Sequence, residues 1–181
     1  MIRAVMLLAF CLAAGSSWAP AFAAVTPGAP EELVGLFIQG CLPFVGNAPA
    51  LREWAQRTGL RPVPEKASAA FLHGVPGQAF DASAAEAKLV LVSSDAGICS
   101  AVTDQATQPL VTAALEAGLR QAGLDFRLIV ERDDPGVAAI HDREYLAARS
   151  KQIADKQGWR ILAATVKDER GGEAMLTAAP E

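Results

Sequence analysis

The strand-like runs in the second half of this chain are joined by links too short to connect parallel strands. The apolar runs 88–92 and 98–103 are separated by a turn at 94–97, and the runs 159–166 and 173–178 by a turn at 168–172. A crossover between parallel strands takes a dozen or more residues, usually a helix. These links therefore predict a largely antiparallel sheet built from hairpins.

Helical patterns precede these strands. Apolar residues between 34 and 41 recur at the spacing of one helix face, and Pro43 ends that helix. A second helix is capped by Asn47 and ended by Gly59, and an Ala-rich third helix covers 65–72. The sequence therefore predicts N-terminal helices that cover one face of the sheet.

One more helix interrupts the strands. Thr107 begins it, Pro109 stands in its first turn and Gly123 ends it, and an alternating strand follows at 126–131. Residues 140–157 fit either a helix or a strand, and we favour a strand because 154–158 is typical of a turn. The predicted fold class is α+β: N-terminal helices, then a largely antiparallel sheet interrupted by one helix.

Residues 1–23 are typical of a secretory signal. Arg3 precedes an apolar run of about 11 residues, and Ala21-Phe22-Ala23 is the small-x-small triplet that a signal peptidase recognises. The run is shorter than the roughly 20 residues of a membrane anchor, and Cys11 lies inside it, which argues against a lipoprotein. We expect cleavage between Ala23 and Ala24, a disordered lead at 24–30, a single domain at 31–181, and a periplasmic or secreted protein without a transmembrane anchor.

Cleavage would also change the cysteine count. The chain has three cysteines, and Cys11 would leave with the signal, so that Cys41 and Cys99 remain. Two cysteines in an oxidising compartment are most simply explained by one disulfide. The alternative is two separate buried thiols, because free cysteine packs as a small hydrophobic residue.

The charge balance narrows the possible partners. Loss of Arg3 with the signal lowers the basic count from 16 to 15 against 20 acidic residues, which gives a net charge of −5. An acidic chain is not steered toward nucleic acids or anionic lipids. We therefore expect no nucleic-acid partner.

No reactive constellation is visible in the sequence. His141 and Glu144 form a His-x-x-Glu pair and His73 lies in a loop, but a zinc site needs three or four ligands and no second motif supplies them. Cys99 lies in a strand without an oxyanion-hole motif, and Ser93 lies outside a Gly-x-Ser-x-Gly elbow. We predict no catalytic residue, no metal site and no cofactor.

Two function hypotheses remain. The first is a non-catalytic domain that binds a small molecule or another envelope protein through its sheet face or its helices. The alternative is an envelope hydrolase whose site assembles from distant residues such as Asp95, His141 and Glu144, which would have to meet in one cleft. Weaker possibilities are a calcium ion at Asp133-Asp134 and an anionic ligand on the basic run 143–151.

Short segments spread over nearly the whole mature chain resemble a family of uncharacterised exported bacterial proteins of unknown function. The segments are Cys41-Leu42-Pro43, 54–62, 76–81, Asp95 to Cys99, 143–145 and 171–178. The resemblance implies one cysteine near the first helix and one after the Asp-x-Gly turn, in agreement with the predicted disulfide. It implies no activity and no catalytic or binding residue.

Overall fold

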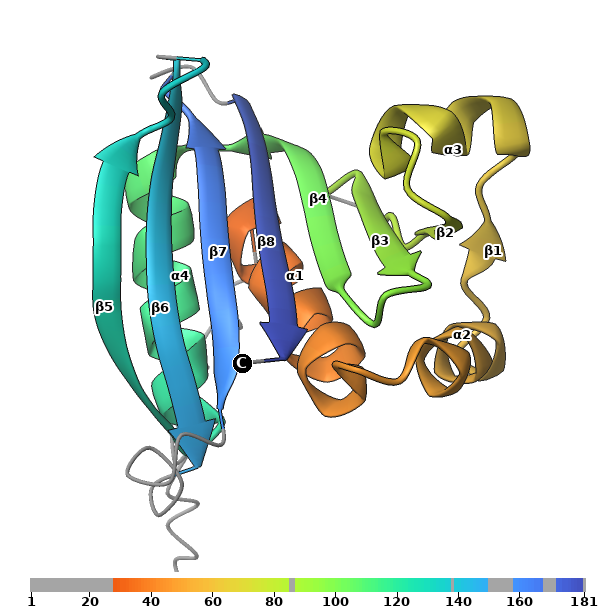
Figure 1. Ribbon diagram of the computed structural model, residues 1–181, viewed down its shortest axis with the longest axis horizontal. Coiled ribbons are helices and arrows are strands. Elements are labelled where there is room, and N and C mark those ends of the chain that lie inside the picture. Colours follow the sequence, from red (N-terminus) through yellow and green to blue (C-terminus); the bar gives the residue numbers. More distant parts are fainter. Residues whose placement is uncertain (1–27, 85–86, 138, 150–157, 168–171, 181) are drawn as a thin grey trace, which may run out of the picture.

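The computed structural model describes residues 28–84, 87–137, 139–149, 158–167 and 172–180, which form one sheet flanked by helices (Figure 1). The helices are α1 (Ala29–Leu36), α2 (Ala48–Arg57), α3 (Glu65–Leu72) and α4 (Gln108–Gln121), and α1 continues into a π-helical turn η1 (Phe37–Cys41) and a 3-10 turn η2 (Leu42–Phe44). The strands are β1 (Arg61–Pro62), β2 (Gly77–Asp81), β3 (Leu89–Ser94), β4 (Cys99–Ala106), β5 (Leu124–Asp133), β6 (Ile140–Arg149), β7 (Trp159–Val166) and β8 (Gly172–Pro180).

All neighbouring strands pair antiparallel, in the order β1-β2-β3-β4-β8-β7-β6-β5. The chain leaves β4 through α4, reaches the far edge at β5, and returns by hairpins until β8 lies beside β4. The α+β fold class and the largely antiparallel sheet are therefore confirmed. The strands β1 and β2 were not predicted, and they extend the sheet beyond β3.

Helices α1 and α4 pack against one face of the sheet, behind strands β5 to β8 in the view of Figure 1. Alternate residues of β7 and β8 point into this layer, such as Ile161 and Leu176, which are fully buried. The largest fully buried side chains are Tyr145, Phe37, Phe80, Leu33, Leu51, Leu91, Leu115, Leu119, Ile161 and Leu176. This apolar layer is the core, and its burial is the main favourable contribution to folding.

Helix α3 lies on the opposite face, over β2 and β3. Side chains of a strand alternate between faces. Leu91 of β3 is buried toward the side of α2, whereas its neighbour Val90 points to the other face and lines a cavity with Phe71 of α3. The prediction that helices cover only one face is therefore wrong at this edge of the sheet, since the extra strands β1 and β2 give α3 a second surface to pack on.

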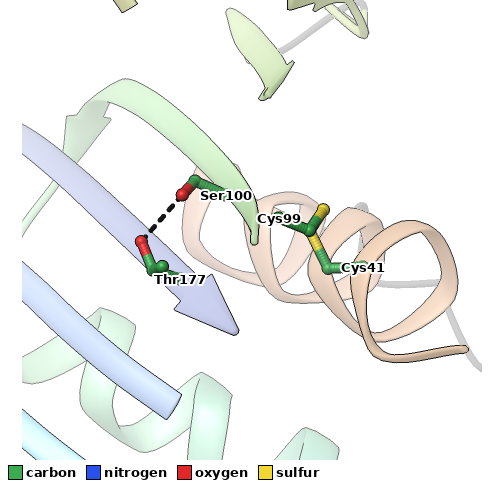
Figure 2. Close-up of a disulfide and its surroundings, with 4 residues drawn as sticks. All are labelled: Cys41, Cys99, Ser100 and Thr177. Carbon is green, nitrogen blue, oxygen red and sulfur yellow. Dashed lines mark hydrogen bonds between the residues drawn. A yellow bond between two sulfur atoms is a disulfide. The ribbon is translucent and has the colours of Figure 1, made fainter. Parts of the chain in front are cut away.

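The disulfide ties the helical layer to the centre of the sheet (Figure 2). Cys41 ends η1 and Cys99 begins β4, with their Cα atoms 5.3 Å apart and both side chains at most 1 % exposed. The next residue of β4, Ser100, shares a 2.8 Å hydrogen bond with Thr177 of β8. The predicted pairing of the two cysteines is thus present in the structure.

Other predictions fall partly outside the described residues. The signal segment 1–23, the cleavage site between Ala23 and Ala24, and most of the lead 24–30 lie outside them, although α1 already begins at Ala29. Residues 140–149 form the strand β6, as favoured, and 150–157 and 168–171 are not described. Within the described ranges, no helix is long and apolar enough to cross a membrane.

Candidate functional site

The side chains that most resemble a binding site surround a cavity between α3 and the sheet. This cavity, which we call the α3 groove, has a volume of about 500 Å³. It is lined by the end of α3, by the link between β2 and β3, and by residues of β3, β4 and β8: Ala70, Phe71, His73, Ser83, Lys88, Leu89, Val90, Val102, Thr103, Asp104 and Glu173. The volume lies in the range of small-molecule sites, which span roughly 300–1,000 Å³.

The sequence of α3 explains why the cavity stays open. The helix has eight residues, of which only Phe71 and Leu72 are large and apolar, and none of the eight is buried. Pro62 and Pro64 precede it, and the backbone turns through the left-handed residue His73 and through Gly74 after it. The short helix therefore spans the edge of the sheet without filling the space beneath it.

The floor of the α3 groove is apolar. Val90 and Val102 are direct partners on β3 and β4, and their side chains point to the face that carries α3. Phe71 forms one wall and is only half-buried. An apolar molecule in the groove would remove these surfaces from water, which is favourable by roughly 25 cal/mol per Å² of buried apolar area.

The mouth of the α3 groove is charged. Lys88 Nζ lies 3.9 Å from Asp104 Oδ2, and both side chains are well exposed. Glu173 on β8 lines the same cavity and is exposed. Two carboxylates and one ammonium group therefore stand at one end of an apolar cavity, an arrangement suited to orienting a bound molecule.

A second hollow lies on the other side of Phe71. Its volume is about 470 Å³, and it is lined by Arg61, Pro62, Val63, Pro64, Phe71, Asp81 and Val90. Hydrogen bonds from Ser83, and to a lesser degree the charge of Arg61, lower the pKa of Asp81. Phe71 thus separates two hollows beneath and beside α3. The second hollow carries the opposite charges Arg61 and Asp81, whereas the α3 groove carries two carboxylates and one lysine.

Asp95, a residue of the hydrolase hypothesis, serves a structural purpose. It lies in the turn between β3 and β4 and forms an ion pair with Arg52 of α2. The same guanidinium donates a hydrogen bond of 3.1 Å to the backbone oxygen of Ser93. The side chain of Asp95 therefore helps to fasten α2 to the sheet.

His141 lies far from that turn, at the opposite end of the sheet. Its Nδ1 is 3.1 Å from Asp133 Oδ1 and its Nε2 is 3.3 Å from Glu131 Oε1. Lys167 Nζ is 2.6 Å from the same Asp133 oxygen. Hydrogen bonds from Lys167 and then from His141 lower the pKa of Asp133. These contacts hold the ends of β5, β6 and β7 together.

We expect Asp133→Asn to change the pH dependence of stability. A lowered pKa means that folding favours the carboxylate, so the stabilisation is present above about pH 4 and is lost as the pH falls below that value. The variant should be less stable than the wild type at pH 7, and the difference should shrink toward pH 2.5. Urea unfolding across this range measures it, with Asp125→Asn on the same strand as control. A difference that stays constant with pH would contradict the assignment.

Glu144 completes the hydrolase trio and points away from His141. It lies on the face opposite α4, where its Oε1 is 2.7 Å from Arg160 Nε. His141 and Glu144 are three residues apart on a strand and therefore face opposite sides of the sheet. The structure brings no two of Asp95, His141 and Glu144 together, so the hydrolase site as hypothesised is not formed.

The calcium hypothesis loses its residues to other contacts. The basic run 143–151, of which residues 150 and 151 lie outside the described residues, has Arg143 in another contact. Asp134 Oδ1 accepts hydrogen bonds of 2.7 Å from the backbone nitrogens of Gly136 and Val137, and Asp133 is bonded to Lys167. Among the described residues, no group of three or more His, Cys, Asp and Glu is placed to hold a metal ion. In the basic run, Arg143 is 3.5 Å from Glu131.

No protein-family model, no curated protein and no solved structure matches the chain. The resemblance to an exported family therefore stays a prediction.

Sequence reasoning missed the α3 groove because its lining comes from segments a hundred residues apart. The one local signal was an Ala-rich helix with a single aromatic residue, Phe71.

Proposed function

We propose that this protein is a non-catalytic binding domain that holds a small amphipathic molecule in the α3 groove. In this proposal the chain is exported, is cleaved between Ala23 and Ala24, and works in the periplasm or outside the cell. The buried disulfide between Cys41 and Cys99 supports an oxidising location. A small molecule is favoured over an envelope protein because the candidate site is concave.

One observation carries the proposal: α3 buries no residue of its own, yet it covers an apolar floor. A short helix gains little stability alone, because most helical stability in proteins comes from packing an apolar face. Phe71 and Val90 are half-buried and leave apolar surface on the two sides of the cavity, and Val102 beside Val90 is 8 % exposed. A ligand between them would supply the packing that α3 lacks.

The arrangement of reactive groups supports binding over catalysis. Acid–base chemistry needs its groups within hydrogen-bond reach of one reacting atom. The hydrolase candidates Asp95, His141 and Glu144 lie apart, and Asp95 and Glu144 are each paired with an arginine. The α3 groove has its carboxylates and its lysine at the mouth, over a floor of valines, and His73 is the one histidine in its lining.

Filling the α3 groove tests the proposal. We expect the mature protein to bind Nile red, an uncharged apolar dye, with a rise in fluorescence, and Ala70→Trp to abolish most of this binding because Ala70 lines the cavity. Ala69→Trp is the matched control, since Ala69 is exposed on the same helix outside the lining. Circular dichroism checks that both variants fold.

Two results would overturn the proposal. One is wild-type protein that gives no saturable Nile red signal. The other is equal dye binding by Ala70→Trp and Ala69→Trp, which would place the dye elsewhere on the molecule.

A further inference from the structure

We infer that the molecule held in the α3 groove is an amphipathic amine, with its apolar body on the valine floor and its positive charge at the mouth. The inference rests on the proposed function and adds the chemical class of the ligand. It follows from the two carboxylates and the one lysine at the mouth and from the ion pair that already joins the lysine to one of the carboxylates.

The carboxylates at the mouth outnumber the ammonium groups. Lys88, the residue before β3, has its Nζ 3.9 Å from Oδ2 of Asp104 on β4. On the neighbouring strand β8, Ala174 pairs with Thr103 and the register shifts after this pair, and Glu173 and Asp104 both line the cavity on the face of α3. Within the described part of the chain, Glu173 has no ion-pair partner.

Neighbouring like charges on paired strands repel each other. Lys88 pairs with Asp104 from the residue before β3, on the side of β4 away from β8. A cation at the mouth would face Glu173 and Asp104 together and relieve that repulsion. An anion at the same place would meet both carboxylates.

The end of α3 adds to the negative potential. The C-terminal end of a helix carries a partial negative charge from its unpaired carbonyl groups. The last turn of α3 supplies Ala70 and Phe71 to the lining and contains no basic residue. The helix end and the two carboxylates therefore favour a cation at the same mouth.

The apolar part of the ligand has its own surface. Phe71 presents a half-buried ring beside Val90 and Val102. These groups offer no charged partner, so a small inorganic cation would leave the floor uncovered. A molecule with an alkyl or aromatic body and a terminal amine satisfies both the floor and the mouth.

Three probes with eight carbon atoms each separate the effect of charge from that of apolar contact: octylamine, octanol and octanoate. At pH 8 the amine is protonated, the acid is ionised and an ordinary imidazole is neutral. From the displacement of Nile red we expect octylamine to bind about tenfold more tightly than octanol, because one charge-assisted hydrogen bond has about this effect on affinity. Octanoate should bind more weakly than octanol.

Glu173→Gln isolates the carboxylate that carries the inference. It should weaken octylamine about fivefold to tenfold and leave octanol unchanged. Glu53→Gln on α2 is the matched control, because Glu53 pairs with Arg57 away from the α3 groove. Isothermal titration calorimetry with each alkyl probe gives the same comparison without the dye.

The outcomes separate this inference from the proposed function. If octanol binds as tightly as octylamine, or if Glu173→Gln leaves octylamine binding unchanged, the amine is wrong while the groove still binds apolar molecules. If Nile red binds but no alkyl probe displaces it, the inference also fails. If Nile red does not bind, the proposed function fails, and the inference fails with it.

Discussion

The double variant Cys41→Ala/Cys99→Ala is expected to lose about 4 kcal/mol of unfolding free energy. A disulfide removes conformations from the unfolded chain, and loop-entropy arithmetic gives about 4 kcal/mol for a loop of this size. The two cysteines are separated by 58 positions. Urea unfolding of the wild type and the double variant, followed by tryptophan fluorescence, measures the difference.

Two controls accompany this measurement. Wild-type protein in reductant should approach the stability of the double variant once the bridge is reduced, and reductant should leave the double variant unchanged. Mass analysis after alkylation without reductant should find no modified thiol in the mature wild type. Unfolding midpoints within error of each other would mean that the bridge does not stabilise the fold.

The bridge matters because of where it lies. Cys41 ends the helical segment that begins with α1, and Cys99 begins β4, which pairs with β3 on one side and β8 on the other. The sheet order brings β8, the last strand of the chain, beside β4. One covalent link therefore joins the helical layer to the strand on which both halves of the sheet meet.

Alternating patterns made the central strands predictable. The predicted strand 159–166 is the observed β7, and every second residue from Ile161 to Thr165 is buried against the helices. The helix from Thr107 was equally clear, since its buried residues Val111, Leu115 and Leu119 recur every four positions. Periodicity predicts such elements because one side of each faces the core.

The edge of the sheet could not be predicted in this way. Strand β1 has two residues, both exposed, and β2 is the short segment Gly77–Asp81, with a glycine and two polar residues. Neither segment shows a period. Strand β1 pairs with β2 and β2 with β3, and the pattern within each short segment does not indicate these pairings. The α3 groove is lined by the predicted strands β3, β4 and β8, but α3 reaches them because it packs over β2 and β3, and this placement was not predicted.

The His-x-x-Glu pair shows how one uncertain element affects a functional hypothesis. On a helix, residues three apart share a face, so His141 and Glu144 would lie together. On a strand they face opposite sides of the sheet. The structure has a strand there, and each side chain has other partners: Glu131 and Asp133 for His141, Arg160 for Glu144.

Gly97→Ala is expected to cost about 3 kcal/mol of stability, the sum of a left-handed backbone and a steric clash. Gly97 has a φ of +80°, and an added Cβ would lie 2.7 Å from the Cα of Gly46. The backbone nitrogen of Gly46 also donates a 2.9 Å hydrogen bond to the oxygen of Gly97. The turn cannot move away from Gly46 without loss of this bond.

Gly59→Ala separates the two causes of that loss. Gly59 has a φ of +82° and nothing within 4 Å of an added Cβ, so it should cost only about 1 kcal/mol. Urea unfolding of both variants gives the comparison, and equal losses would mean that the approach to Gly46 is not tight.

Because Gly97 lies two residues before Cys99, the cost of Gly97→Ala should fall when the disulfide is absent and the turn can move from Gly46. A loss that stays the same in the Cys41→Ala/Cys99→Ala background would show that the bridge does not hold the turn.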